Sequence, residues 1–566
     1  MTRKLTLTLA AALACFGAAT DQARADGLAG AYLAGRQALM HNDFAAAAPH
    51  LSVAVARDPQ HELLLESMIA THVALGDVAR AVPAARAMLD QGFPTQTAHV
   101  VILADQVERG AWEEVLAGAE GRNVGPLIEG LVVAWAQLGL GRMSEAVAEF
   151  DRLMGDPTLA PFAAQHKALA LASAGDFEGA EEILRGAAGS GLGLTRRGVQ
   201  AHVQVLSQLD RVEEAQALLA AVLDANADPV LESLQERLAD GEVLPFTIIQ
   251  QPADGVAEVF YSVAMALAPE DGDQSALLYA RLASHDRPAH TDAILLSASL
   301  LESMGQYDLA TAAYNRISRD DPAYDAAELG RAEALYNGGR VEAAIEVMEQ
   351  LARARPDLPL IHIGLGDMLR REGRHAEAIP AYDRAIALID EPSDGHWALF
   401  YSRGISHERE GNWPEAEADF RSALDLRPDQ PLVLNYLGYS YVERNENLDE
   451  ALGMIERAVA ARPEDGFITD SLGWVLYRLG RYEEAVEHME RAVELTATDP
   501  IINDHLGDVY WAVGRRLEAE FQWRRALSFK PEPEEERRIR RKLDVGLDAV
   551  LAEEGAPPLR MTMNGN

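Results

Sequence analysis

Alanine recurs along this chain at a spacing of about 34 residues, a period typical of stacked helical repeats. In the C-terminal units the alanine follows a Gly and precedes a large apolar residue by four positions and a second Ala by seven, as in Ala485, Met489 and Ala492. The clear examples are Ala310, Ala344, Ala378, Ala416, Ala451, Ala485 and Ala519. Weaker examples are Ala47, Ala81, Val115, Ala146, Ala180, Ala215 and Ala276. The spacing predicts about 13 to 14 repeats.

The last unit, "HLGDVYWAVGRRLEAEFQWRRALSFKP", shows why these residue types recur. Gly507 and Ala519 are small, so they allow two helix backbones to approach closely, while Trp523 fills the space beside them. Gly514 predicts the turn that ends the first helix of the unit. Pro531 predicts the end of the second helix, because the residue before a proline disfavours helical geometry.

The period and these positions resemble the tetratricopeptide repeat. That resemblance implies an all-α solenoid, a right-handed superhelix of helical hairpins whose first helices line a concave groove. A single hairpin cannot bury its apolar face alone, so stacked neighbours share one continuous core.

Breaks in the period predict the domain boundaries. We expect a signal peptide at residues 1–25, a degenerate repeat array at 26–235 and a linker at 236–255, where "EVLPFTIIQQPADG" interrupts the spacing. A second array is expected at 256–531. Ile539, Leu543 and Leu547 recur at helical spacing and predict a capping helix at 532–555. Residues 556–566 are expected to be a disordered tail.

The N-terminal segment "MTRKLTLTLAAALACFGAATDQARAD" has the order of a secretory signal. Arg3 and Lys4 precede an apolar stretch, and small residues precede a cleavage position after Ala25. We therefore expect a periplasmic protein. Cys15 leaves an alternative open, because "ALAC" is similar to a weak lipobox; lipidation there would make an outer-membrane lipoprotein facing the periplasm. An N-terminal helix of the fold is the other alternative.

Charge and cysteine content exclude several classes of function. The formal net charge is -39, whereas nucleic-acid binding needs a basic surface. We expect no nucleic-acid partner, and contact with a membrane only if Cys15 is lipidated. Cys15 is the chain's one cysteine, so cleavage after Ala25 leaves no thiol for a disulfide, a nucleophile or a metal. The oligomeric state is not predicted.

The stretch "INDHLGDVYW" gathers two carboxylates and an imidazole, which raises the question of a metal or acid/base site. Asp504 and Asp508 share one helix face, but no partner completes a metal-binding set, and His505 lies on another face. The chain also lacks Gly-x-Ser-x-Gly, a phosphate-binding loop and His-Glu-x-x-His. We therefore expect no catalytic residue, no metal, no cofactor and no enzymatic activity.

Alignment of three successive repeats on their glycines instead places polar and aromatic residues in columns. We expect these columns to line a groove that binds a protein or peptide. The predicted groove residues are Asn435, Tyr439, Asp470, Trp474, Asp504, Asp508 and Trp511, with Arg370 and Arg403 as further candidates. Two alternatives stay open: the aromatic residues pack between helices, and the arginines form ion pairs.

The sequences "LNYLGYSYVER", "DSLGWVLYRLGRYEEAVEHMERAV" and "HLGDVYWAVGRRLEAEFQWRRAL" carry a second resemblance. Residues 395–530 are similar to the C-terminal repeats of bacterial envelope adaptor proteins that partner a carboxy-terminal processing protease. The resemblance implies a scaffold that presents envelope proteins to a protease or an assembly complex. The alternative is an accessory module of an export system that binds a glycan or a secretion component.

Overall fold

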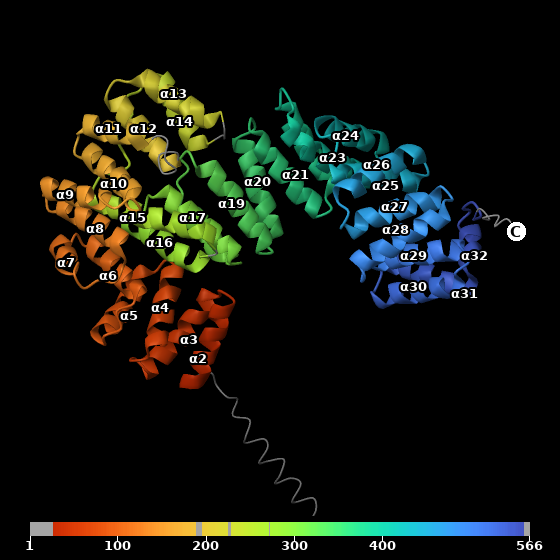
Figure 1. Ribbon diagram of the computed structural model, residues 1–566, viewed down its shortest axis with the longest axis horizontal. Coiled ribbons are helices and arrows are strands. Elements are labelled where there is room, and N and C mark those ends of the chain that lie inside the picture. Colours follow the sequence, from red (N-terminus) through yellow and green to blue (C-terminus); the bar gives the residue numbers. More distant parts are fainter. Residues whose placement is uncertain (1–26, 188–194, 225–227, 271, 560–566) are drawn as a thin grey trace, which may run out of the picture. The chain divides into compact units, whose positions relative to one another are not determined.

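Helical hairpins follow one another along the whole described chain in a computed structural model (Figure 1). The structure describes residues 27–187, 195–224, 228–270 and 272–559. These residues form α-helices α2 to α32 and two short 3-10 helices, and no strand occurs among them. The predicted all-α solenoid is confirmed. The predicted signal peptide and Cys15 lie outside the described residues.

The chain divides into two compact units, residues 1–351 and 352–566, and the division falls within α20. The helices of the first unit are α2 (Leu28–Met40), α3 (Phe44–Arg57), α4 (Glu62–Ala74), α5 (Val78–Asp90), α6 (Gln96–Glu108), α7 (Trp112–Ala117), α8 (Pro126–Gly139), α9 (Met143–Met154), α10 (Ala160–Ser173), α11 (Phe177–Ala187), α12 (Arg196–Gln208), α13 (Val212–Leu223), α14 (Pro229–Ala239), α15 (Pro252–Leu267), η1 (Ala268–Glu270), α16 (Asp273–Asp286), α17 (Thr291–Ser303), α18 (Tyr307–Tyr314), α19 (Tyr324–Asn337) and α20 (Val341–Ala354).

The helices of the second unit are α21 (Pro359–Arg371), α22 (His375–Ala387), η2 (Asp394–His396), α23 (Trp397–Arg409), α24 (Trp413–Leu426), α25 (Pro431–Arg444), α26 (Leu448–Ala461), α27 (Gly466–Arg478), α28 (Tyr482–Leu495), α29 (Pro500–Ala512), α30 (Arg516–Ser528), α31 (Pro533–Val545) and α32 (Leu547–Glu553).

The recurring alanine positions form the spine of the core. Every one of the predicted anchor residues, Val115 included, is fully buried at 0% exposure. Each lies on the second helix of its hairpin, from α3 to α30. The close approach predicted at Gly507 is also present, because a Cβ there would lie 2.4 Å from Nε1 of Trp523. Gly514 adopts a φ of +84°, which confirms it as the turn that ends α29.

The first unit has its own later helices inside the arc of its earlier ones (Figure 1). Helix α15 packs against α8, and α16 packs against α4 and α6, although these helices are far apart in the sequence. Gly255 of α15 permits this contact, since a Cβ there would lie 2.2 Å from the indole of Trp135. Helices α15 and α16 therefore occupy the space where an open groove was expected in this half.

The segment predicted as a linker, 236–255, belongs to the first unit, so the predicted domain boundary is wrong. Leu244, Ile248 and Ile249 are buried, which ties the irregular stretch between α14 and α15 to the core. The backbone N–H of Thr247 donates to Oε1 of Gln204 on α12 at 2.8 Å. The break in the repeat period thus marks the point where the chain turns inward, rather than a connection between domains.

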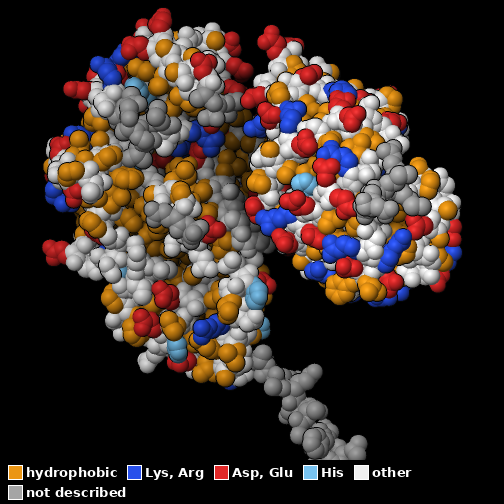
Figure 2. All heavy atoms as spheres, turned by 45° about the vertical axis from the view of Figure 1, so that its right-hand side comes forward, with side chains coloured by type: hydrophobic (Ala, Val, Ile, Leu, Met, Phe, Trp, Pro, Cys, Tyr) orange, Lys and Arg blue, Asp and Glu red, His pale blue; other side chains and the backbone are white. Residues whose placement is uncertain are grey.

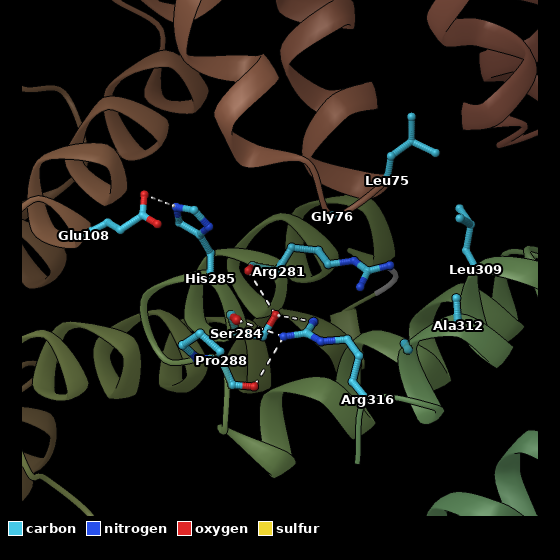
Figure 3. Close-up of a pocket in the computed structure, with 11 residues that line it drawn as sticks. Leu75, Gly76, Glu108, Arg281, Ser284, His285, Pro288, Leu309, Ala312 and Arg316 are labelled. Atoms are coloured by element: carbon cyan, nitrogen blue, oxygen red, sulfur yellow. Dashed lines mark hydrogen bonds and ion pairs between the residues drawn. The ribbon is translucent and has the colours of Figure 1, made fainter. Parts of the chain in front are cut away.

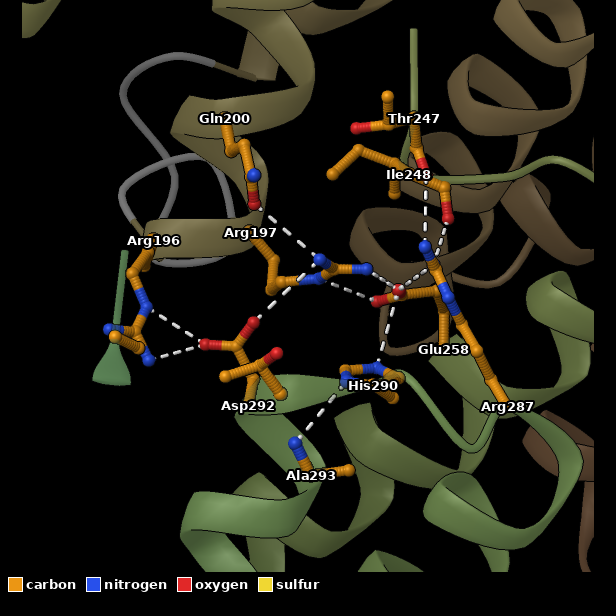
Figure 4. Close-up of polar contacts among 12 residues, drawn as sticks. Arg196, Arg197, Gln200, Thr247, Ile248, Glu258, Arg287, His290, Asp292 and Ala293 are labelled. Atoms are coloured by element: carbon orange, nitrogen blue, oxygen red, sulfur yellow. Dashed lines mark hydrogen bonds and ion pairs between the residues drawn. The ribbon is translucent and has the colours of Figure 1, made fainter. Parts of the chain in front are cut away.

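A buried network of charges holds α12 against the inner helices (Figure 4). Arg197 of α12 pairs with Glu258 of α15, and Arg196 pairs with Asp292 of α17. Nε2 of His290 lies 3.3 Å from Glu258. Burial lowers the pKa of Arg197 to about 10, with Asp292 opposing that shift. The network satisfies charges that would otherwise be costly to bury.

The C-terminal cap consists of two helices instead of the single helix expected at 532–555. Helix α31 ends at Val545, and Gly546, whose φ is +84°, forms the turn between α31 and α32. Trp511 of α29 occupies the space beside Gly546, where a Cβ would lie 2.6 Å from the indole ring. The turn at Gly546 allows α32 to pack against α31, and Leu547 is part of the core of the second unit.

Candidate groove of the second unit

The first helices of four successive hairpins, α23, α25, α27 and α29, line a cavity of about 470 Å³ in the second unit. Three of the predicted groove residues, Asn435, Tyr439 and Asp470, line this cavity together. Phe467 and Ile501 also line it, and they are 58% and 42% exposed. Successive first helices present these residues to one space because the hairpins stack in register.

Hydrogen bonds fix most of the polar groups around this cavity. Tyr436 donates to Glu408 at 3.3 Å, and Trp474 donates from Nε1 to Glu443 at 2.7 Å. Burial, followed by the nearby Glu408, raises the pKa of Tyr436 to about 12. Burial also raises the pKa of Tyr439, and the carboxylate of Glu443 adds to that effect. Both phenols therefore stay neutral hydrogen-bonding groups at physiological pH.

The amide of Asn435 differs from these groups. Its Oδ1 is buried and accepts no hydrogen bond within the described part of the chain. An unsatisfied buried acceptor of this kind costs about 1–3 kcal/mol.

The cavity has more acidic than basic groups. Glu408, Glu443, Asp470 and Asp499 line it, against Arg409 and Arg444. The guanidinium of Arg444 lies 4.7 Å from the centre of the Trp413 ring, which holds this cation at one side of the cavity. Across the visible face of the second unit, acidic, basic and hydrophobic side chains are interspersed (Figure 2).

Asp504 and Asp508, predicted as groove residues, are buried beneath α31. The ammonium of Lys542 lies 2.7 Å from Oδ2 of Asp504 and 2.7 Å from Oδ1 of Asp508. Trp523 also donates to Asp508 at 2.9 Å. The structure corrects the prediction here, because these carboxylates are already paired and a partner cannot reach them while α31 is in place.

The predicted Trp474 and Trp511 pack between helices, which is the alternative that the sequence left open. Trp474 is 8% exposed and stacks on His505, with ring centres 4.0 Å apart. Trp511 lies under the guanidinium of Arg516 at 3.6 Å and donates to Asp548 at 2.9 Å. Neither residue lines the cavity that contains Asn435.

His505 is part of this packing. Its Nδ1 lies 3.0 Å from Oδ2 of Asp470. Burial lowers the pKa of His505, but the carboxylates of Asp470, Asp504 and Asp508 together outweigh burial and leave the pKa above its usual value. The pair fixes Asp470 at the edge of the cavity, so His505 contributes to the groove by positioning that carboxylate.

Arg370 and Arg403 make contacts of their own, outside the cavity. Arg403 pairs with Asp419 at 2.6 Å and with Asp383 at 2.7 Å. Arg370 donates to the hydroxyl of Tyr382 at 3.3 Å. Arg370 also lies 3.7 Å from Asp367. The ion-pair alternative therefore describes both arginines, although these acidic partners were not predicted.

Sequence reasoning missed Phe467, Ile501 and Tyr436 in this groove. Phe467 and Ile501 come at the start of α27 and α29, where the repeat pattern sets no residue type. Their large apolar side chains outside the repeat positions were the available signal.

Among the described residues no group of three or more His, Cys, Asp and Glu is placed to hold a metal ion. None of the helices described is both long and apolar enough to cross a bilayer.

Comparison with known proteins agrees with the helical hairpins. The tetratricopeptide repeat model matches residues 295–359, 329–394, 401–466 and 443–500. The fold and these matches together show a solenoid of the tetratricopeptide type over residues 295–500. The chain thus carries tetratricopeptide repeats in both of its units, with matches over less than half of its length.

Individual relatives match more distantly. The chain is 35% identical over 83 residues to the TPR repeat-containing protein PA4667 of Pseudomonas aeruginosa, which covers 15% of this chain and 14% of that protein. Among solved structures, a chain of the APC/C hetero-tetramer Cut9-Hcn1 is 15% identical with a TM-score of 0.38, covering 91% of this chain and 96% of that one. YrrB, described as a TPR protein with an unusual peptide-binding site, is 17% identical with a TM-score of 0.26, covering 31% and 90%.

Proposed function

We propose that this protein is a scaffold that binds an extended segment of another protein in the groove of its second unit. The observation that carries the proposal is the cavity across α23, α25, α27 and α29, which Asn435 lines beside the exposed side chains of Phe467 and Ile501. A peptide backbone supplies N–H donors, and its side chains supply apolar contact area.

The charges of the groove indicate the kind of segment that fits. Four carboxylates against two guanidinium groups favour a partner with basic side chains. The exposed Phe467 and Ile501 favour apolar residues beside them. We therefore propose that the bound segment combines Lys or Arg with large apolar residues.

A labelled peptide of alternating Lys and Leu tests this proposal by fluorescence polarisation with the full chain. We expect the Phe467→Ser variant to bind about tenfold more weakly or worse, as for a buried aromatic contact. Phe521→Ser is the matched control, because Phe521 is 62% exposed on α30 and does not line the cavity. A peptide with Glu in place of Lys should not bind.

Equal weakening by Phe467→Ser and Phe521→Ser would contradict the groove assignment. Binding that is insensitive to the Lys-to-Glu change would contradict the charge preference, because the attraction depends on opposite charge and is screened by salt. Circular dichroism of both variants establishes that the helices are intact in each measurement.

We further propose that this binding takes place in the bacterial periplasm, where the protein presents envelope proteins to a protease or an assembly complex. The secretory pattern of residues 1–25 supports the location. The resemblance of residues 395–530 to envelope adaptors supports the role, and the groove lies within that region. Fractionation of cells that carry a C-terminally tagged chain tests the location; recovery in the cytoplasm would contradict it.

A further inference from the structure

A second cavity, of about 360 Å³, lies in the first unit, far along the chain from the groove. It forms where early and later repeats meet: Gly76 follows α4, Glu108 ends α6, and Arg281 and Ser284 belong to α16 (Figure 3). Arg316, after α18, completes it. Residues that are more than 200 positions apart in the sequence therefore line one pocket.

Two arginines in this pocket have no acidic partner. Arg281 is only 6% exposed, and its Nε is buried without an acceptor. Arg316 donates to the carbonyl oxygen of Ser284 at 3.1 Å and to that of Pro288 at 3.4 Å. Within the described residues, neither guanidinium forms an ion pair, although acidic residues outnumber basic ones by 89 to 50 in the chain.

The acidic groups nearby do not neutralise these arginines. Glu108 contacts His285 at 3.2 Å across the pocket. Asp286 is buried, and burial raises the pKa of its carboxyl well above the usual value. Burial and the neighbouring Arg316 lower the pKa of Arg281 to about 10, so the guanidinium is still charged at neutral pH. Arg281 is a buried charge without a counter-ion, with the exposed Arg316 as a second cation beside it. Such a charge is costly to bury, and a bound anion would relieve that cost.

The rest of the lining shows what kind of anion fits. Leu75, Leu309 and Ala312 provide an apolar wall opposite the charged groups (Figure 3). A water molecule takes about 30 Å³ in the liquid, so the cavity has room for far more than an inorganic ion. The carboxylate of Glu108 at one side disfavours a ligand with several negative charges.

We propose that this pocket binds a small organic carboxylate, with Arg281 and Arg316 holding the carboxylate and Leu75, Leu309 and Ala312 contacting its apolar body. A guanidinium is well suited to this role because its N–H groups match the geometry of a carboxylate. The ligand is either a free acid or the C-terminal carboxylate of a peptide. Its binding links α4 to α16 and α18, and so stabilises the closure of the first unit.

Isothermal titration of the full chain with hexanoate tests this proposal, with hexanamide as the neutral analogue and inorganic phosphate as the simple anion. We expect hexanoate to bind and hexanamide not to. Arg281→Met should weaken hexanoate binding by about tenfold or more, the usual effect of losing a charge-assisted hydrogen bond. Arg152→Met is the control, since Arg152 is exposed and pairs with Glu149 elsewhere in the unit.

Thermal unfolding keeps the test decisive. Without ligand, Arg281→Met should unfold at the same temperature as the wild type or higher, because it removes a buried unpaired charge. Ala312→Phe fills the pocket from an exposed position without changing charge, and should also abolish hexanoate binding. Binding that both variants leave unchanged would overturn the proposal, as would equal binding of hexanamide.

Titration with two peptides ending in Leu, one with a free C-terminus and one amidated, distinguishes a free acid from a peptide C-terminus as the ligand. Tighter binding of the free peptide than of hexanoate identifies a peptide terminus; binding of hexanoate alone identifies a free acid. Phosphate that binds as tightly as hexanoate, with the same loss in Arg281→Met, would contradict the organic carboxylate and identify a simple anion site.

Discussion

Lys542 is a buried lysine whose position depends on two carboxylates 34 and 38 residues earlier in the chain. Its ammonium contacts Asp504 and Asp508 at 2.7 Å and lies 5.8 Å from the centre of the Trp523 ring. The side chain is 0% exposed, so the charge is stable there only because both partners are present. The triad joins α31 to α29 and closes the end of the solenoid.

Lys542→Met should therefore destabilise the protein strongly. It leaves two carboxylates buried side by side, with only the more exposed Arg538 still near them at 3.8 and 3.6 Å. Breaking a buried ion pair on one side costs about 3–5 kcal/mol. Urea unfolding followed by circular dichroism measures the loss. Lys542→Met combined with Asp504→Asn and Asp508→Asn removes all three charges and should recover part of the stability. A triple variant less stable than Lys542→Met would contradict this account.

The same residues show what the sequence alone could not settle. The spacing of Asp504 and Asp508 correctly places both on one face of α29. Which helix covers that face depends on how α31 folds back. No sequence motif around Lys542 identifies Asp504 and Asp508 as its partners. Asn435 and Asp470 line one cavity because the repeat register alone determines their position, and their contact with a partner stays a prediction.

At the scale of helices, small residues decide where elements meet. The repeat glycines were predictable because each hairpin packs against its own neighbour. The contact of α15 with α8 was not, because it joins helices that are over 100 residues apart and follows no period. Gly255 makes this contact possible, and nothing in its local sequence distinguishes it from an ordinary glycine near a helix start.

Replacing Gly255 with Ala should destabilise the first unit, because the added methyl group would overlap the indole of Trp135. Overpacking of this kind costs about 1–3 kcal/mol. Gly453→Ala is the matched control: Gly453 lies in α26 with nothing within 4 Å of a Cβ. That change should stabilise the protein by about 0.5–1 kcal/mol, since Ala loses less entropy in a helix. A destabilised Gly453→Ala together with a neutral Gly255→Ala in urea unfolding would contradict both assignments.

At the scale of the whole molecule, the chain consists of two units with separate cores. One core cluster runs from Leu65 to Ala293 in the first unit, and another from Trp413 to Leu547 in the second. The sequence predicted two halves but placed their boundary about 100 residues too early, at the break in the repeat period. The period reports where hairpins stack, whereas the boundary between units depends on which helices share a core.

Division of the chain before Pro356, in the connection between α20 and α21, should therefore yield two fragments that fold separately. Residues 356–566 contain the groove of Asn435 and Phe467 and should bind the Lys–Leu peptide within about twofold of the full chain, since that change corresponds to only about 0.4 kcal/mol. Residues 27–355 contain the Arg281 pocket and should bind hexanoate instead. Circular dichroism and titration of each fragment measure both properties. A fragment 356–566 that is helical but does not bind the peptide would show that the groove needs the first unit. Loss of helix in either fragment would contradict the separate cores.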